Sequence, residues 1–356
     1  MDEHLLVIIK LGGAALTDKR AYRHLKESNL ATVAADISAV WRPLQHKPHR
    51  HLAIVHGAGS FGHQDVHAAH LIGAKLDARA SAATSLGLAR TRASLTLLHA
   101  AVLDALVRED ISVATVASWP HGDGVAENTL ATIERGLVPV LHGDVVIDAA
   151  TGVLSVLSGD ELVSRLADAW LATCTTASTS PALPPRVVIY FVTGAAGVFT
   201  APPERAELSP RIIRSVLVPR RRGSDVDTPL QEPRWFDGDG RPIAGGEVND
   251  VSGRTSVIDV SGGIVAKLGC AVDIVRRHSR ATVAIIGEAA LHDALDAAFN
   301  TENQADLVAS FAPRRLEGPA AAVPGTLVIR DTCAQLEPLQ VAWAGRPGLP
   351  LIARAE

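Results

Sequence analysis

Cysteine, lysine and long apolar runs are all scarce in this 356-residue chain. Its three cysteines, Cys174, Cys270 and Cys333, lie far apart and have no CxxC spacing, which argues against a disulfide framework, a metal site and a redox centre. No apolar run approaches the roughly 18 residues of a membrane span. The start MDEH is acidic and polar, unlike the basic start of a signal peptide. These absences predict a soluble protein of a reducing cytoplasm.

Excess positive charge is also lacking, since the formal net charge is −4 at pH 7. This balance predicts neither a nucleic acid nor a membrane surface as partner. The run RRR at 220–222 lies among glycines and aspartates, where a solvated loop is the simpler interpretation. Of the 34 basic residues only six are lysines and the other 28 are arginines. A lysine near a glycine-rich turn is therefore a candidate for a compact point charge, as at Lys10, Lys19 and Lys267.

Short apolar runs alternate with helical patterns along most of the chain. The runs expected to form strands are 5–13, 51–56, 111–118, 137–148, 186–199, 281–287 and 325–331. Helical periodicity predicts helices over 29–44, 79–109, 128–135, 158–173 and within 256–278. This alternation predicts an α/β fold in which a mainly parallel sheet has helices on both faces. Residues 219–256 lack apolar periodicity and are expected to be a surface insertion without regular structure.

Glycines gather where the predicted strands end. They occur at Gly12 and Gly13, at Gly57, Gly59 and Gly62, at Gly143, and at Gly194 and Gly197. In a parallel sheet ligands bind beyond the carboxyl ends of the strands, so these turns are expected to share one edge. Bare backbone N–H groups in such turns form cradles for anions. Several cradles rimmed by lysines suit two facing phosphate groups, and phosphoryl transfer needs mainly that kind of positioning and charge neutralisation.

Two better-known nucleotide motifs do not account for this pattern. The sequence GxxxxGK[ST] of P-loop enzymes is absent. GAGSFG at 57–62 matches GxGxxG, but a dinucleotide site also needs an acid about 20 residues further on, and Asp77 lies in a helical pattern. His63, His67 and His70 have a spacing that would suit zinc on a helix, yet HExxH is absent and solvated histidines explain them more simply.

Several motifs in order resemble those of the amino acid kinase superfamily, and most closely those of the isopentenyl phosphate kinases. They are KLGG (10–13), TDK (17–19), HGAGSFGH (56–63), PVLHGDVV (139–146), SGD (158–160), DVSGG (259–263) followed by Lys267, and GT (325–326). HGAGSFGH is the specific part. The resemblance implies a three-layer αβα sandwich, the amino acid kinase fold, over 1–331, with an acceptor-binding part at about 1–172 and a nucleotide-binding part at about 186–331. It also implies a homodimer, and leaves 332–356 as a tail of unknown role.

The resemblance further implies that ATP, with Mg²⁺, phosphorylates isopentenyl phosphate to the diphosphate. Lys10, Lys19 and Lys267 would then contact the transferring phosphate, and His63 would hold the acceptor phosphate. The nucleotide would meet Lys10, Gly12, Gly13, Gly59, Thr193, Gly194, Gly263 and Lys267. The acceptor would meet Ala58, Gly59, His63, Gly143 and Gly159. No residue is expected to be a metal ligand.

Three positions depart from the motifs of the superfamily. Ala14 stands where a serine usually follows the first glycine pair, which removes a hydroxyl donor but keeps the backbone cradle. Gly194 and Ala196 replace two acids that commonly lie near the nucleotide. Two alternatives therefore stay open. One is a kinase of the same superfamily acting on a phosphonate, as in fosfomycin resistance, or on a carboxylate or carbamate. The other is a nucleotide-binding regulator without activity.

Overall fold

A computed structural model describes residues 3–18, 20–77, 80–173, 184–200, 211–219, 232–237, 241–243, 263–311 and 323–330. The strands are β1 (Leu5–Leu11), β2 (Arg50–His56), β3 (Val113–Thr115), β4 (Val138–His142), β5 (Asp144–Ile147), β6 (Leu154–Leu157), β7 (Arg186–Thr193), β8 (Val198–Phe199), β9 (Ile212–Val218), β10 (Arg234–Asp237), β11 (Pro242–Ile243), β12 (Ala281–Gly287) and β13 (Thr326–Arg330). The helices are α1 (Gly13–Leu16), α2 (Glu27–Trp41), α3 (His63–Ala68), α4 (Ala82–Arg108), α5 (Val125–Glu134), α6 (Gly159–Ala172), α8 (Gly263–Arg277), α9 (Leu291–Asn300) and α10 (Gln304–Phe311).

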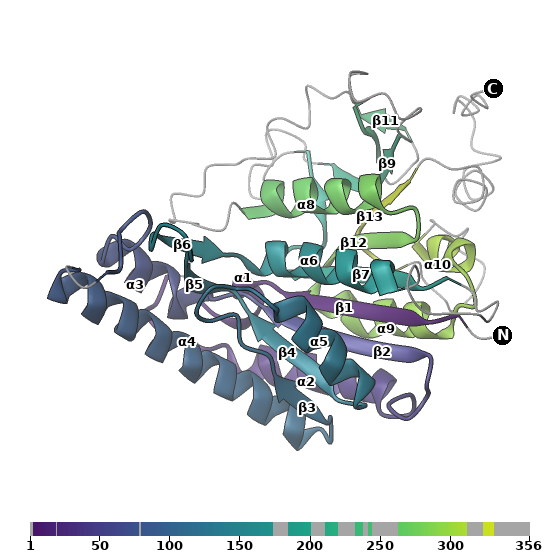
Figure 1. The fold of residues 1–356 in the computed structure, drawn as a ribbon. Coiled ribbons are helices and arrows are strands. Elements are labelled where there is room, and N and C mark those ends of the chain that lie inside the picture. The colour runs from purple at the N-terminus through teal and green to yellow at the C-terminus, as the bar shows by residue number, and fades with distance from the viewer. Residues whose placement is uncertain are drawn as a thin grey trace.

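One large sheet forms the middle layer of the molecule (Figure 1). Its strand order is β11-β10-β9-β13-β12-β7-β1-β2-β4-β3, and β8 pairs with β9. Every neighbouring pair from β12 to β3 is parallel, whereas β13 is antiparallel to β12. β5 and β6 form a separate antiparallel hairpin. The predicted α/β fold with a mainly parallel sheet is confirmed.

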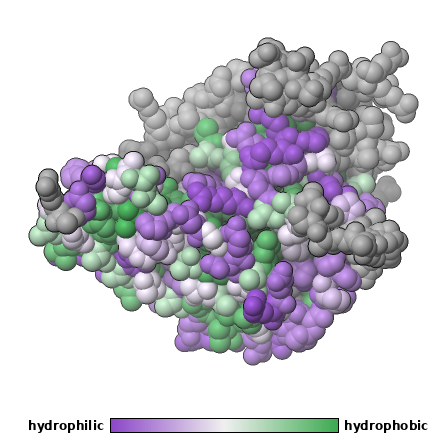
Figure 2. Space-filling view, viewed as in Figure 1, coloured by the Kyte–Doolittle hydropathy of each residue, from purple (hydrophilic) through white to green (hydrophobic). Residues whose placement is uncertain are grey.

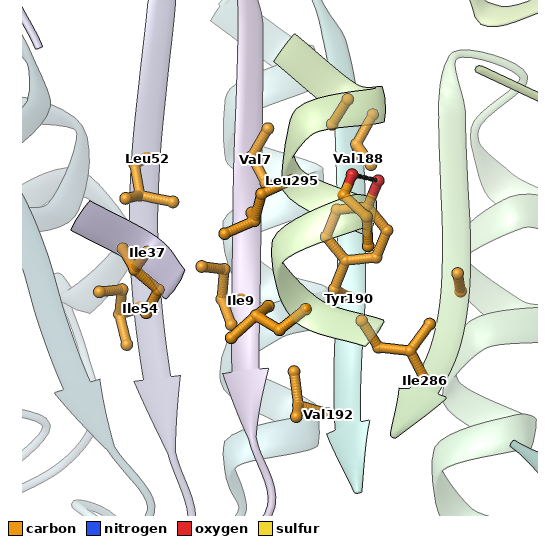
Figure 3. Packing of buried hydrophobic residues seen from close by; sticks show 14 of the residues in the cluster. Val7, Ile9, Ile37, Leu52, Ile54, Val188, Tyr190, Val192, Ile286 and Leu295 are labelled. Atoms are coloured by element: carbon orange, nitrogen blue, oxygen red, sulfur yellow. Dashed lines mark hydrogen bonds between the residues drawn. The ribbon is translucent and has the colours of Figure 1, made fainter. Parts of the chain in front are cut away.

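The central strand β1 is buried on both faces, which explains its nearly continuous apolar sequence. Alternate residues enter two cores. Val7 and Ile9 belong to the core beneath α2, α4 and α9, and Figure 3 shows them beside side chains of β2 and β7. Leu6 and Ile8 belong to the opposite core, beneath α5, α6 and α8. This packing fixes the register of the central strands, and so aligns their carboxyl ends.

The segment 219–256 differs from its prediction. Its described residues contain two short strands, β10 and β11, which extend the sheet beyond β9. Phe236 and Ile243 are buried there. Apolar periodicity missed these strands because they are only four and two residues long. The predicted tail 332–356 lies outside the described residues.

Candidate active site

The glycine turns meet at the carboxyl ends of the central strands, as predicted. A Cβ atom at Gly13 would lie 2.6 Å from the Cα and N atoms of Gly59, and one at Gly12 would lie 2.8 Å from the carbonyl oxygen of Val192. These distances are too short for any side chain, so the backbone of one turn packs directly on the backbone of the next. The turns after β1 and β2 are therefore in contact, and the first of them packs against the end of β7.

The turns after β4 and β6 join the same group. A Cβ atom at Gly143 would lie 3.0 Å from the nitrogen of Gly159, the first residue of α6. A Cβ atom at Gly159 would lie 3.2 Å from Cε of Lys10 and 3.6 Å from the carbonyl oxygen of His56. Gly143, which the sequence predicted at this shared edge, thus lies with Gly159, Lys10 and the end of β2.

Ala58 and Gly59 form a backbone concavity suited to an anion. Ala58 has φ −70° and ψ −31°, and Gly59 has φ +51°, a right-handed residue followed by a left-handed one. Successive N–H groups converge in that conformation and bind anions. Within the described parts of the chain, the N–H groups of Ala58 and Gly59 have no hydrogen-bond acceptor. We call this pair the anion nest.

Thr17 ties the anion nest to the first glycine turn. Its hydroxyl donates a 2.8 Å hydrogen bond to the carbonyl of Gly13 and accepts one of 3.0 Å from the N–H of Ser60. Both Thr17 and Ser60 are buried. One side chain thus fixes the spacing between the turns after β1 and β2. The sequence analysis quoted Thr17 within TDK but gave it no role.

His63 opens α3 and lies half-buried, four residues after Gly59. The helix continues only to Ala68, and His70 has φ +46° outside it. The three histidines therefore do not share one helix, as the spacing for zinc assumed, and the described residues contain no group of three or more candidate metal ligands. His67 and His70 instead have their ring centroids 6.2 Å apart.

A buried ionic group lies beside the glycine turns. Lys10 on β1 and Lys267 on α8 both face Asp160 on α6, with Nζ–Oδ distances of 2.8 and 3.5 Å. All three side chains are less than 10% exposed. Two ammonium groups around one carboxylate leave a net positive charge in a place of low polarity. Such a site attracts an anion.

Burial, followed by the nearby ammonium of Lys267, lowers the pKa of Lys10 to about 8, although Asp160 opposes both effects. The carboxylate of Asp160 therefore helps to keep Lys10 charged near neutral pH. In the sequence, Asp160 appeared only within SGD, at the start of a predicted helix. Ser158 caps that helix, and its hydroxyl accepts a hydrogen bond from the N–H of Glu161. The SGD motif could have pointed to Asp160. Its contacts with Lys10 and Lys267 could not be read from the sequence, because both lysines are distant along the chain.

The predicted nucleotide residues border the same edge. Thr193 ends β7, and its hydroxyl donates to the carbonyl of Ala195 at 2.8 Å. Gly263 opens α8, and its carbonyl accepts a 3.2 Å hydrogen bond from Lys267. Although Gly194 lacks a side chain, an acid does lie nearby, because a Cβ there would be 3.9 Å from Oε1 of Glu288. Burial raises the pKa of Glu288.

Two further lysines follow the first glycine turn in the sequence. Lys26, which the sequence analysis did not single out, donates a 2.6 Å hydrogen bond to the carbonyl of Ala14 beside the first glycine turn. Lys19 lies outside the described residues, so its predicted role stays a prediction. Across the described ranges no helix is long and apolar enough to cross a membrane.

The family is decided by a match to a family model. The model described as "Amino acid kinase family" matches residues 6–183, which is half of the chain. This chain belongs to the amino acid kinase family. The matched region contains the first three glycine turns, Lys10, Asp160 and His63, so the family relationship covers most of the described site.

Individual relatives are similar over a larger or smaller part of the chain. An isopentenyl phosphate kinase of Arabidopsis thaliana is 28% identical over 308 residues, which cover 76% of this chain and 86% of the relative. An isopentenyl phosphate kinase of Haloferax volcanii is 35% identical over 170 residues, 46% of this chain and 64% of the relative. The first of these alignments extends well beyond the part matched by the family model.

Solved structures share the fold. A crystal structure of an isopentenyl phosphate kinase substrate complex superposes with a TM-score of 0.59 at 19% identity, covering 90% of this chain and 99% of that one. A product complex of the Thermoplasma acidophilum isopentenyl phosphate kinase gives a TM-score of 0.56 at 21% identity, covering 84% and 97%. At these identities the similarity shows a common fold.

Proposed function

We propose that this protein is an isopentenyl phosphate kinase, which transfers the γ-phosphoryl group of ATP to isopentenyl phosphate and releases isopentenyl diphosphate and ADP. The observation that carries the proposal is the anion nest of Ala58 and Gly59, packed against the first glycine turn near the buried Lys10–Asp160–Lys267 group. The isopentenyl phosphate kinases among its relatives support the choice of substrate.

On the acceptor side, the anion nest would receive the phosphate of isopentenyl phosphate, and His63 would donate a hydrogen bond to it. Gly143 and Gly159 would line the same pocket with bare backbone. The second ionisation of a phosphate monoester falls near 6, close to the usual histidine pKa of about 6.5. A hydrogen bond between two such groups selects the acceptor without holding the diphosphate product permanently.

On the donor side, the triphosphate would lie along Gly12, Gly13, Thr193, Gly194 and Gly263. An oxygen of the acceptor phosphate attacks the γ-phosphorus, so one P–O bond forms while the bond to ADP breaks. The ammonium groups of Lys10 and Lys267, with Lys19, would neutralise charge on the transferring group. Each well-placed donor of this kind contributes a few kcal/mol, about 3 for an oxyanion-hole amide.

The residues present fit a polyphosphate better than they fit a protein-bound metal. The cradle offers bare amides and buried ammonium groups, while its carboxylate, Asp160, already faces two lysines. Magnesium keeps much of its hydration and binds through substrate phosphates as readily as through carboxylates. Mg²⁺ would therefore arrive on the phosphates of ATP, where it supplies further neutralisation of charge.

We propose that the chain forms the homodimer that the family resemblance implies, and that two copies associate through α4. Leu86, Leu97 and Val107 on this helix are 51%, 56% and 56% exposed. Leu86 and Leu97 are eleven residues apart, about three turns, and so share one face. Figure 2 shows apolar surface at the end of the molecule where α3 and α4 lie.

We place the reaction in the cytoplasm, where ATP is available.

The test of the proposed function is turnover with labelled ATP and a panel of acceptors. The panel contains isopentenyl phosphate, dimethylallyl phosphate, fosfomycin, acetate and carbamate, each tested separately. Diphosphate product from the short alkyl phosphates alone supports the proposal. Product from the phosphonate or the carboxylates would change the acceptor. ATP binding in calorimetry without turnover of any acceptor would favour a regulatory protein.

A further inference from the structure

Three histidines, two of them buried, cluster where β2 and β4 end, and His56 lies two residues before the anion nest. His56 ends β2 and His142 ends β4, and the two are register partners in the sheet. His99 reaches them from α4. The ring centroids of these residues lie 4.9 to 5.5 Å apart. His56 is fully buried and His99 is 7% exposed. The proposed reaction gives this cluster no role so far.

The hydrogen bonds of His56 and His99 form a chain in which each group donates to the next, from Thr115 through His99 and His56 to Gly57. Nδ1 of His56 lies 3.2 Å from the carbonyl oxygen of Gly57, which only accepts, so Nδ1 carries the proton. Nε2 of His56 then accepts from Nδ1 of His99, 2.9 Å away. Nε2 of His99 in turn accepts from the hydroxyl of Thr115, also at 2.9 Å. The rings of His56 and His99 each have one proton and two satisfied nitrogens.

This direction requires neutral rings, and the surroundings favour them. Burial lowers the pKa of His56 well below its usual value and that of His99 to about 4. A second proton on His56 would lie on Nε2 and face the N–H of His99 across the 2.9 Å contact. At neutral pH the Gly57 carbonyl, which only accepts, therefore selects the tautomer in which His56 donates to it, and the Thr115 hydroxyl satisfies Nε2 of His99 by donating.

The bond to Gly57 sets the orientation of the next amide. In a trans peptide the C=O of one residue and the N–H of the following residue point in opposite directions. Since the Gly57 carbonyl faces His56, the Ala58 N–H faces away from the histidine cluster. The N–H of Gly57 is itself held by the carbonyl of Leu11 at 2.9 Å. The Gly57–Ala58 peptide, beside a flexible glycine, would otherwise be free to flip.

We propose that His56 is a positioning residue that holds the Ala58 N–H in the anion nest, and that His99 and Thr115 support the His56 tautomer which makes this possible. The inference rests on the proposed function only in taking the occupant of the nest to be the acceptor phosphate. His142 repeats the arrangement at the neighbouring strand, where its Nδ1 lies 3.0 Å from the carbonyl oxygen of Gly143.

Two amide substitutions separate this role from simple packing. In His56→Asn the side-chain N–H₂ replaces Nδ1 and still donates to Gly57. In His56→Gln the amide lies at the position of Nε2, so it still meets His99 but leaves Gly57 without its donor. We expect His56→Gln to lose at least about tenfold in kcat/KM for isopentenyl phosphate, whereas His56→Asn loses about threefold or less. The KM for ATP stays within twofold in both.

His51, at the other end of β2, provides the matched control. Its Asn and Gln variants should leave both substrates unaffected, apart from any change in the midpoint of thermal unfolding. Equal losses in His56→Asn and His56→Gln would overturn the inference, because a histidine that only fills space does not distinguish the two amides. A parallel loss for ATP and acceptor would overturn it as well.

A second measurement does not depend on turnover. Labelling glycine with ¹³C at its carbonyl and alanine with ¹⁵N selects the Gly–Ala peptides, of which the chain has four: 13–14, 57–58, 73–74 and 194–195. Inorganic phosphate should shift the 57–58 signal of the wild type and not the 73–74 signal. In His56→Gln the 57–58 signal should start at a different position and respond at least about threefold more weakly.

The two measurements also separate the two proposals. Failure of isopentenyl phosphate as a substrate, with a normal phosphate response at 57–58, removes the proposed function and leaves the role of His56 intact. A 57–58 signal that is identical in wild type and His56→Gln, with or without phosphate, removes the role of His56 whatever the enzyme phosphorylates.

Discussion

The carboxylate of Asp160 lies 2.8 Å from the ammonium of Lys10, and both side chains are almost completely buried. The ammonium of Lys267, on α8, lies 3.5 Å from the same carboxylate. The group of three side chains therefore carries a net positive charge. The ammonium of Lys267 lowers the pKa of Lys10, and the carboxylate of Asp160 partly raises it again. Asp160 therefore helps to set the charge of Lys10.

This relationship predicts the pH dependence of the reaction. Lys10 has a pKa of about 8, so its ammonium is lost as the pH rises through that value. We expect kcat/KM, which reports the free enzyme, to fall above about pH 8. In Asp160→Asn the opposing carboxylate is gone, so the fall should begin at lower pH.

A neighbouring acid on the same helix gives the control for Asp160. Asp168 pairs with Arg277 at 3.1 Å and is about half-exposed. Asp168→Asn should keep the wild-type pH profile. An alkaline limb that stays in place in Asp160→Asn would contradict the assigned effect of the carboxylate on Lys10.

Gly59 predicts a sharp contrast between two glycine substitutions. In Gly59→Ala the new Cβ would lie 2.1 Å from Oγ1 of Thr17, at φ +51°. The hydroxyl must move, which breaks its bonds to Gly13 and Ser60 and opens the anion nest. A left-handed alanine costs about 1 kcal/mol, and the broken buried hydrogen bonds cost about 1–3 kcal/mol more. We expect the acceptor kcat/KM to fall at least about tenfold.

Gly73, like Gly59, has a positive φ, but no other group crowds the position of a Cβ atom there. Its φ is +81°, and nothing lies within 4 Å of the position of a Cβ. Gly73→Ala should therefore lose about 1 kcal/mol of unfolding free energy and keep its kinetics. Urea unfolding and acceptor kinetics measured on both variants check this. Equal kinetic effects at the two glycines would contradict the role given to the nest.

The buried histidines predict acid sensitivity of the fold. His51 and His99 have pKa values of about 4, lowered mainly by burial from the ordinary 6.5. Between these pH values the unfolded chain binds more protons than the folded one, so the free energy of unfolding falls as the pH falls from about 6.5 to about 4. Urea unfolding at several pH values tests this. His51→Gln should flatten the fall, and a flat wild-type profile would contradict the assignment.

The exposed apolar face of α4 predicts a dimer. Sedimentation of the wild type should give about twice the mass of one chain. Leu97→Asp places a charge on the 56% exposed position and should shift the protein to monomer, while the equivalent change at Ile72, exposed but on a different segment, should not. A wild-type monomer at micromolar concentration would remove the dimer from the account.

Local patterns predicted most of the fold and much of the candidate site. A buried parallel strand followed by glycine is visible in a few adjacent residues, so the turns at Gly12, Gly59 and Gly143 were predictable. The contacts of Asp160 were not, because Lys10 and Lys267 lie on other elements far along the chain. Nor was the approach of Glu288 to Gly194, which depends on the pairing of β7 with β12.

The role of His56 was hidden for a different reason. It precedes the glycine loop that drew attention to His63, and its partners His99 and Thr115 come from α4 and β3. The strands β10 and β11 were missed because short edge strands carry too few residues for a period to appear. Sequence patterns thus identified the backbone of the site, whereas side-chain partners required the three-dimensional packing.

The most direct test of the central claim is the rate of diphosphate formation from isopentenyl phosphate and labelled ATP, compared between wild type and His63→Ala. We expect product from the wild type and a loss of at least about tenfold in kcat/KM for the acceptor in the variant, corresponding to a single charge-assisted hydrogen bond. The absence of diphosphate product from the folded wild-type protein, or an unchanged rate in His63→Ala, would contradict the account.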